Sequence, residues 1–179
     1  MKNITLLALS GSLRSASYNT AAIKALKNLA PTHIKIVIGS IAQLPLFNPD
    51  LEGQPIPALD GLVSTLKQAD GLIIASPEYA HGISGPMKNT LDWLVGSVDF
   101  PYKPIMLINT SPRAQHAHEA LLEVLTTMSG NIINGACVSI PLLSSDLDSD
   151  GIIDDKEISE TLLSALEEFR VAIEAQISA

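Results

Sequence analysis

Short apolar segments alternate along this chain with longer segments in which apolar residues recur every three or four positions. The first pattern is typical of strands buried on both faces, and the second of helices that cover a sheet with one apolar side. The predicted strands are residues 3–9, 33–38, 71–75, 104–108 and 132–140, the last with a bulge at Gly135. The predicted helices are residues 19–29, 58–68, 84–95, 114–128 and 157–177. This alternation predicts one three-layer α/β domain over residues 1–179, with a parallel sheet between two layers of helices.

Composition narrows the class of protein. The chain has 179 residues, a length that suits one domain with a substantial core. A net charge of −8 argues against nucleic-acid partners, because an acidic field repels a phosphate polyanion. The single cysteine, Cys137, excludes an internal disulfide framework and a cysteine metal cluster. No apolar run reaches the roughly 18 residues that a membrane span needs. Residues 1–9 lack the cleavage site of a signal peptide, so we expect a cytoplasmic protein without membrane partners.

The loop after the first predicted strand, residues 10–20, is rich in hydroxyl groups and contains one cation, Arg14. Hydroxyls and free backbone N–H groups at a helix N-terminus form a good pocket for a phosphate group. The loop matches neither GxGxxG nor GxxxxGK[ST], and it lacks a lysine or an acidic magnesium ligand, which argues against triphosphate chemistry. The alternative is an ordinary surface loop in which Ser17 or Asn19 caps the helix.

The loop after the third predicted strand, residues 76–94, contains glycine, proline and polar residues at a spacing that packing alone does not explain. Gly82 and Gly85 allow the backbone to approach a flat ligand closely, and Pro86 suits the first turn of a helix. One side of that helix carries polar residues that can brace the loop or face a partner subunit: Lys88, Asn89 and Asp92. For the only tryptophan, Trp93, a place in the core is favoured over a role as a ligand platform. His81 and Glu78 also have an alternative interpretation, as solvated loop residues.

Together the sequences of these two loops resemble those of the NADPH-dependent FMN reductase family. Its members are flavodoxin-like oxidoreductases and include chromate, quinone and azo-dye reductases. The signature G-S-x-R-x-x-S-x-N is matched from Gly11 to Asn19, and P-E-Y-x-x-G-x-x-G-x-x-K-N-x-L-D-W is matched from Pro77 to Trp93. The resemblance covers nearly the whole chain. It implies a flavodoxin-like three-layer sandwich with a five-stranded parallel sheet of order 2-1-3-4-5.

The resemblance also implies an FMN site. The residues that it assigns to the FMN phosphate are Ser10, Ser12, Arg14, Ser17 and Asn19, with Thr20 nearby. Those that it places along the isoalloxazine ring are Pro77, Glu78, Tyr79, Ala80, His81 and Gly82, with Ser111 on the other side of the flavin. One residue and one loop depart from the family pattern. Ala80 stands where many members have asparagine, and residues 110–116 replace a glycine-rich loop.

The activity that the resemblance implies is an FMN-dependent NAD(P)H oxidoreductase in which the cofactor performs the chemistry. We expect ping-pong transfer from NADPH or NADH to the flavin and then to a small-molecule acceptor, such as free flavin, a quinone, an azo or nitro compound, or a metal oxyanion. No catalytic side chain is predicted, and Cys137 is expected to be an inert buried thiol. Arg113 and Lys88 are candidates for binding the ribose phosphate that distinguishes NADPH from NADH. A homodimer or homotetramer is also expected. The alternative is a flavodoxin-like FMN electron carrier.

A second motif, from Asp146 to Glu157, has the acidic residues and the glycine of an EF-hand loop at the key positions. Residues 141–143 lie where the entering helix of an EF-hand should be, and they begin with a proline. An acidic turn that leads into a helix is also favourable without a metal ion. We therefore predict no metal site here, and a calcium-responsive interaction module stays as the third hypothesis.

Overall fold

The computed structural model describes residues 2–113 and 115–178. Its main sheet has the order β2-β1-β3-β6-β7, and β8 also pairs with β6. All pairings in this sheet are parallel. Its strands are β1 (Ile4–Ser10), β2 (Ile34–Gly39), β3 (Gly71–Ala75), β6 (Pro104–Asn109), β7 (Asn131–Ile132) and β8 (Val138–Ser139). In order of appearance along the chain this is the predicted 2-1-3-4-5 arrangement, so the predicted flavodoxin-like class is confirmed.

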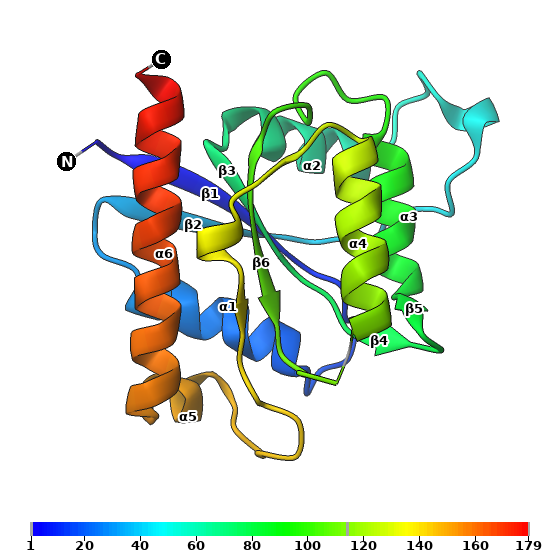
Figure 1. Ribbon diagram of the computed structural model, residues 1–179. Helices are drawn as coiled ribbons and strands as arrows, with labels where there is room; N and C mark the ends of the chain where they lie inside the picture. The colour runs from blue at the N-terminus through cyan, green and yellow to red at the C-terminus, as the bar shows by residue number, and fades with distance from the viewer. Residues whose placement is uncertain (1, 114, 179) are drawn as a thin grey trace.

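Helices cover both faces of the sheet, and each face has its own hydrophobic core (Figure 1). One face is covered by α1 (Tyr18–Leu29), α5 (Ser149–Asp154) and α6 (Lys156–Ile177), and the other by α2 (Pro57–Gln68), α3 (Gly85–Leu94) and α4 (Gln115–Thr127). Alternate residues of β1 serve the two cores. Leu6 packs toward α1 and α6, whereas Leu7 packs toward α2 and α3. This two-sided burial explains the near-continuous apolar pattern of the strands.

The prediction of one continuous fifth strand over residues 132–140 is wrong. Residues 132–140 form two short strands separated by the 3-10 turn η2 (Asn134–Ala136). Asn134 and Gly135 are residues that favour turns, and they interrupt the ladder where only a bulge was expected. Cys137 caps this turn and is half-buried, and burial raises the pKa of its thiol.

Three further elements were not predicted, the first of which is the 3-10 helix η1 (Pro49–Leu51) in the connection between β2 and α2. Residues 78–83 form a small antiparallel hairpin of β4 (Glu78–Tyr79) and β5 (Gly82–Ile83). The short helix α5 precedes α6, inside the segment that resembles an EF-hand loop. The predicted start of the fourth helix at Ala114 lies outside the described residues, and α4 is described from Gln115.

The polar residues of α3 brace the long connection between β2 and α2. Asn89 accepts a hydrogen bond from Phe47 N and donates one to Pro45 O, at 2.7 and 2.9 Å. Trp93 is buried, as predicted, and its indole N–H also donates to Pro45 O. The loop braced here is thus the connection between β2 and α2 and not the loop of residues 76–94 for which the role was considered, and Lys88 and Asp92 form an ion pair with each other at 2.6 Å.

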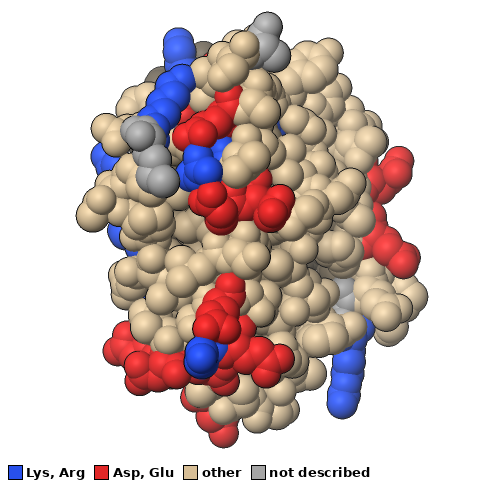
Figure 2. Space-filling model, turned by 60° about the vertical axis from the view of Figure 1, so that its left-hand side comes forward, with Lys and Arg blue, Asp and Glu red and all other residues tan. Residues whose placement is uncertain are grey.

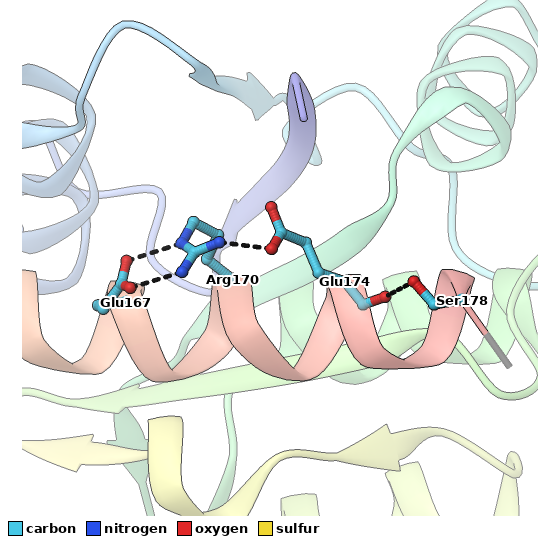
Figure 3. A network of polar contacts seen from close by, with 4 residues as sticks. All are labelled: Glu167, Arg170, Glu174 and Ser178. Atoms are coloured by element: carbon cyan, nitrogen blue, oxygen red, sulfur yellow. Dashed lines mark hydrogen bonds and ion pairs between the residues drawn. The ribbon is translucent and has the colours of Figure 1, made fainter. Parts of the chain in front are cut away.

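Polar side chains form a network along one side of the last helix (Figure 3). Arg170 lies between Glu167 and Glu174 and forms an ion pair with each at 2.6 Å. Hydrogen bonds from the guanidinium group lower the pKa of Glu167. Figure 2 shows a second group of acidic side chains near the bottom of the molecule. In Figure 1 this is where α5 and the start of α6 lie. Within the described residues no helix is long and apolar enough to cross a membrane.

Candidate functional site

The loops that follow β1 and β3 lie against each other at the carboxyl edge of the sheet, in the lower part of Figure 1. Gly11 N donates to Ala75 O at 2.8 Å and so continues the sheet pairing beyond the end of β1. A Cβ atom on Gly11 would lie 2.4 Å from Ser76 Oγ and 2.9 Å from Ser76 Cβ; the hydroxyl can rotate away, but the Cβ contact would force a shift between the two loops. Glycine is therefore required for this close approach.

A buried hydroxyl fastens the same two loops together. Ser84, which is fully buried, donates from Oγ to Gly11 O at 2.6 Å. The same oxygen accepts a hydrogen bond from Met87 N and thereby caps α3. The beginning of α3 is thus joined to the loop after β1, and residues from three elements form one packed unit.

A cavity of about 200 Å³ opens beside this unit. It brings together eight of the predicted site residues from the loops after β1, β3 and β6: Ser12, Arg14, Ser17, Asn19, Pro77, Glu78, Tyr79 and Ser111. Three segments that are far apart in the sequence therefore meet at one opening, as expected for loops at the carboxyl ends of neighbouring strands.

One end of the cavity has the chemistry of an anion site. Ser17 caps α1 by accepting a hydrogen bond from Thr20 N, so the helix N-terminus faces this end with its unpaired N–H groups. Arg14 is exposed and forms no ion pair with any described residue. The buried Asn19 side chain accepts a hydrogen bond from Thr110 Oγ1 and so joins α1 to the end of β6. Hydroxyls, N–H groups and one cation are the donors that a phosphate monoester needs.

The other end of the cavity is bordered by the β4–β5 hairpin. Its two central residues, Ala80 and His81, both have positive φ angles, of 50° and 57°. A two-residue hairpin with this geometry is a type I′ turn, in which asparagine and glycine are preferred. The departure from the family pattern at Ala80 thus falls where the left-handed backbone disfavours an alanine.

Glu78 connects this hairpin to α4. Its Oε2 accepts a hydrogen bond from Ala117 N at 2.9 Å, and its Oε1 lies 3.8 Å from His81 Nδ1. The imidazole rings of His81 and His116 are also close, with their centroids 4.5 Å apart. The carboxylate of Glu78 therefore has a partner within the protein, at the N-terminus of a helix.

The remaining predicted site residues lie outside the lining of this cavity. Ser10 lies behind the loop, where its hydroxyl forms a hydrogen bond with Thr20 Oγ1 at 2.8 Å. Thr20 lines a second cavity on the outer side of α1. Ala80, His81 and Gly82 form the tip of the hairpin, beyond the residues that line the opening.

Six lining residues were missed by sequence reasoning: Ala16, Tyr18, Ser76, Asn109, Thr110 and Leu143. Ser76, Asn109 and Thr110 stand directly at strand ends, and this position is the signal that could have identified them. Leu143 comes from the loop after β8, for which the sequence offered no such signal.

The segment that resembles an EF-hand loop uses its acidic side chains as helix caps. Asp148 Oδ1 accepts hydrogen bonds from Asp150 N and Gly151 N, and Asp155 Oδ1 accepts one from Ile158 N. In the part of the chain that is described, no three histidine, cysteine or carboxylate side chains are arranged to hold a metal ion. The acidic turn thus stabilises the starts of α5 and α6.

Comparison with known proteins agrees with this geometry. Residues 4–143 match the NADPH-dependent FMN reductase family. An NAD(P)H-dependent FMN reductase from Pseudomonas aeruginosa is 33% identical over 178 residues, which cover 92% of this chain and 94% of that protein. A quinone reductase from Escherichia coli is 34% identical over 116 residues, which cover 62% of this chain and 61% of that protein.

A solved structure is also similar over almost the full length. FerB, a flavoenzyme NAD(P)H:(acceptor) oxidoreductase from Paracoccus denitrificans, matches with a TM-score of 0.82 and 26% identity. The match covers 96% of this chain and 98% of that one. The extent of the family match and the full-length relative together establish that this chain belongs to the NADPH-dependent FMN reductase family.

Proposed function

We propose that the cavity at the carboxyl edge of the sheet binds FMN and that this chain transfers electrons from NADPH or NADH to a small-molecule acceptor. The observation that carries the proposal is the joining of two different ends in one cavity. Arg14 and the start of α1 lie at one end, and the hairpin residues Pro77 to Tyr79 lie at the other. Membership of a flavin oxidoreductase family supports the same activity.

The phosphate of FMN fits the donor set at the α1 end. Ser12 and Ser17 contribute hydroxyls, the first turn of α1 contributes N–H groups, and Arg14 contributes a guanidinium group without a protein partner among the described residues. A dianion is favoured here in spite of the net charge of the chain, because short-range hydrogen bonds and the helix dipole act directly on it.

The wall from Pro77 to Tyr79 positions the flat part of the ligand. When bound, FMN supplies two-electron redox chemistry, namely hydride acceptance from a nicotinamide and electron donation to the acceptor. The chain contributes binding and orientation. The β4–β5 hairpin presents backbone groups at the ring edge, and its attachment to α4 through Glu78 fixes where those groups lie.

Donor and acceptor substrates share one opening in this proposal. The loops after β1, β3 and β6 border the cavity, and we expect the oxidised dinucleotide to leave before the acceptor binds. The names of the relatives suggest the acceptor class: quinones and free flavin are the first candidates. Azo and nitro compounds and metal oxyanions are the wider set, since a flat redox-active ring accepts many partners.

An absorption spectrum of the purified chain loaded with FMN tests the proposal. We expect flavin bands that bleach on anaerobic addition of NADPH and return when a benzoquinone is added. Double-reciprocal plots of the initial rate against NADPH concentration, at several fixed quinone concentrations, should give parallel lines, as a ping-pong order requires. Flavin that binds but stays oxidised with both NADPH and NADH would instead indicate an electron carrier that depends on a separate reductase. Failure to bind FMN would remove the proposal.

A further inference from the structure

A second cavity begins at the phosphate end of the proposed FMN site. It has a volume of about 360 Å³, which is within the usual range for ligand sites. Four residues line both cavities: Arg14, Ala16, Ser17 and Tyr18. The two spaces therefore share part of their lining at the N-terminus of α1. The other lining residues of the first come mainly from the loops after β3 and β6, and those of the second from α1 and the loop that leads into α5.

The wall of this second cavity has two sides. One side is a single face of α1, with Thr20, Ala21 and Lys24 at helical spacing. The other side is the loop that leads into α5, from Asp146 to Ser149. Tyr18 fastens the two sides together, because its hydroxyl accepts a hydrogen bond from Asp146 N at 3.4 Å. The acidic segment that resembles an EF-hand loop thus forms part of a cavity that continues the proposed flavin site.

We propose that this second cavity holds the adenosine monophosphate part of FAD, so that the site accepts a flavin dinucleotide as well as FMN. This inference rests on the proposed function and extends it to a second flavin. FMN ends at its phosphate, whereas FAD continues from that phosphate through a second phosphate, a ribose and an adenine. A cavity that starts at the phosphate end is where such an extension must lie.

The lining contains two cations, Arg14 and Lys24, and two carboxylates, of which that of Asp148 already accepts hydrogen bonds from Asp150 N and Gly151 N. Arg14 lines both cavities, and its planar guanidinium group can donate to two neighbouring phosphates. Lys24 lies one to two helical turns further along α1 and adds a second cation on the same side. Asp146 lies on the opposite side, and its carboxylate accepts no hydrogen bond from any described residue. A carboxylate in this state can accept hydrogen bonds from ribose hydroxyls or from the adenine amino group, which is how an acidic residue recognises the ribose in other dinucleotide sites.

Direct titration of the flavin-free chain by calorimetry tests the proposal without using activity. We expect FAD to bind at least as tightly as FMN. Lys24→Ala should weaken FAD binding about three- to tenfold, as expected for the loss of one exposed charge-assisted contact, and should change FMN binding less than twofold. Ala21→Trp, which fills the cavity from the same face of α1, should weaken FAD binding at least about tenfold and also leave FMN binding unchanged. The matched control is Lys27→Ala, on the same helix but outside the cavity, and it should change neither affinity.

Three results would overturn the proposal while the proposed function stands. The first is FMN binding together with FAD binding that is more than tenfold weaker. The second is a pair of variants, Lys24→Ala and Ala21→Trp, that leave FAD binding unchanged or weaken both flavins equally. The third is an increase in the KM for NADPH of the FMN-loaded Lys24→Ala variant without any loss of FAD affinity, which would assign the cavity to the adenosine phosphate of the nicotinamide dinucleotide. Failure to bind either flavin would remove both the proposed function and this inference.

Discussion

The carboxylate of Glu78 accepts a hydrogen bond from the backbone N–H of Ala117, the third residue of α4. The two residues come from different loops of the proposed site, one after β3 and the other after β6. N–H groups in the first turn of a helix have no partner within the helix, and an anion near them is stabilised by the helix dipole. The side chain of Glu78 therefore joins the hairpin that borders the cavity to the start of α4.

Loss of this contact should loosen the site. We expect Glu78→Ala to reduce the free energy of unfolding by about 1 to 2 kcal/mol, the usual effect of removing a helix cap. FMN affinity should fall as well, because the hairpin is released from α4. Glu78→Gln keeps an acceptor oxygen and should recover more than half of both effects. Thermal unfolding and flavin titration of the two variants give the measurement, and equal losses for both would show that the charge matters more than the hydrogen bond.

The turn at Ala80 and His81 should be open to improvement. Both residues have left-handed backbone conformations, which cost an alanine roughly 1 kcal/mol relative to glycine. Ala80→Gly and Ala80→Asn should therefore raise the unfolding temperature by about 2 to 4 °C. Ala80→Val should lower it, because a β-branched residue is disfavoured further at positive φ. A stabilising effect of valine in thermal unfolding would contradict this account of the turn.

Arg14 should matter for the flavin phosphate and little for the fold. Its side chain is exposed and has no ion-pair partner among the described residues, so Arg14→Ala should shift the unfolding temperature of the flavin-free chain by less than about 2 °C. FMN affinity should fall about tenfold to a hundredfold, as expected for one charged hydrogen-bond donor. Lys67→Ala, at the end of α2, removes the same charge elsewhere and should leave FMN affinity unchanged. An equal loss in both variants would indicate a general effect of net charge.

Cys137 should react slowly with thiol reagents. Burial raises the pKa of its thiol, so little thiolate is present near neutral pH. We expect the reaction with an aromatic disulfide reagent at pH 8 to be at least about tenfold slower in the folded chain than in the chain unfolded by urea. The absorbance of the released thiolate follows the reaction, and a rapid stoichiometric burst from the folded chain would contradict the prediction.

The network on α6 should contribute a small pH-dependent stability. Hydrogen bonds from Arg170 lower the folded-state pKa of Glu167, so its contribution is complete above the ordinary glutamate pKa of about 4.3. The contribution is lost as the pH falls below that value and through the lower folded-state pKa. The Glu167 side chain is 58% exposed, so Glu167→Gln should lower the unfolding temperature at pH 7 by only about 1 to 2 °C. This difference should shrink at pH 3, whereas Glu160→Gln should show neither effect.

The parallel sheet between two helix layers could be predicted from the pattern of apolar residues, and the place of the cavity from the rule that ligands bind beyond the carboxyl ends of such strands, whereas the order of the strands came from the family resemblance. β3 is buried along its whole length, as its unbroken apolar sequence requires. The loop from Ser10 to Thr20 signals its chemistry through residue types that a capping role alone does not need. Loops that follow neighbouring parallel strands must meet at one edge, so Arg14 and Pro77 lie at the same cavity although 63 positions separate them.

The details that sequence reasoning missed depend on tertiary contacts. An acidic turn at a helix start was already the favoured interpretation of the segment from Asp146 to Glu157, but the short helix α5 was not foreseen, so Asp148 and Asp155 cap two successive helices where one was expected. Leu143 lines the first cavity and Tyr18 lines both, because the loop after β8 folds over α1. The sequence near these two residues does not indicate that fold of the loop. Ser10 was assigned to the phosphate by the family resemblance, and in the structure its hydroxyl forms a hydrogen bond with Thr20 Oγ1.

The two hydrogen bonds of Ser84 restrict what evolution can place at that position. Aspartate is as good a helix cap as serine, yet an ionised carboxylate has no proton to donate to Gly11 O and would bring two oxygens into repulsion. Asparagine could both donate and accept, but a fully buried site leaves no space for the larger group. Serine therefore combines, in the smallest side chain that can do so, a proton donated to one loop with an oxygen that accepts from the start of a helix.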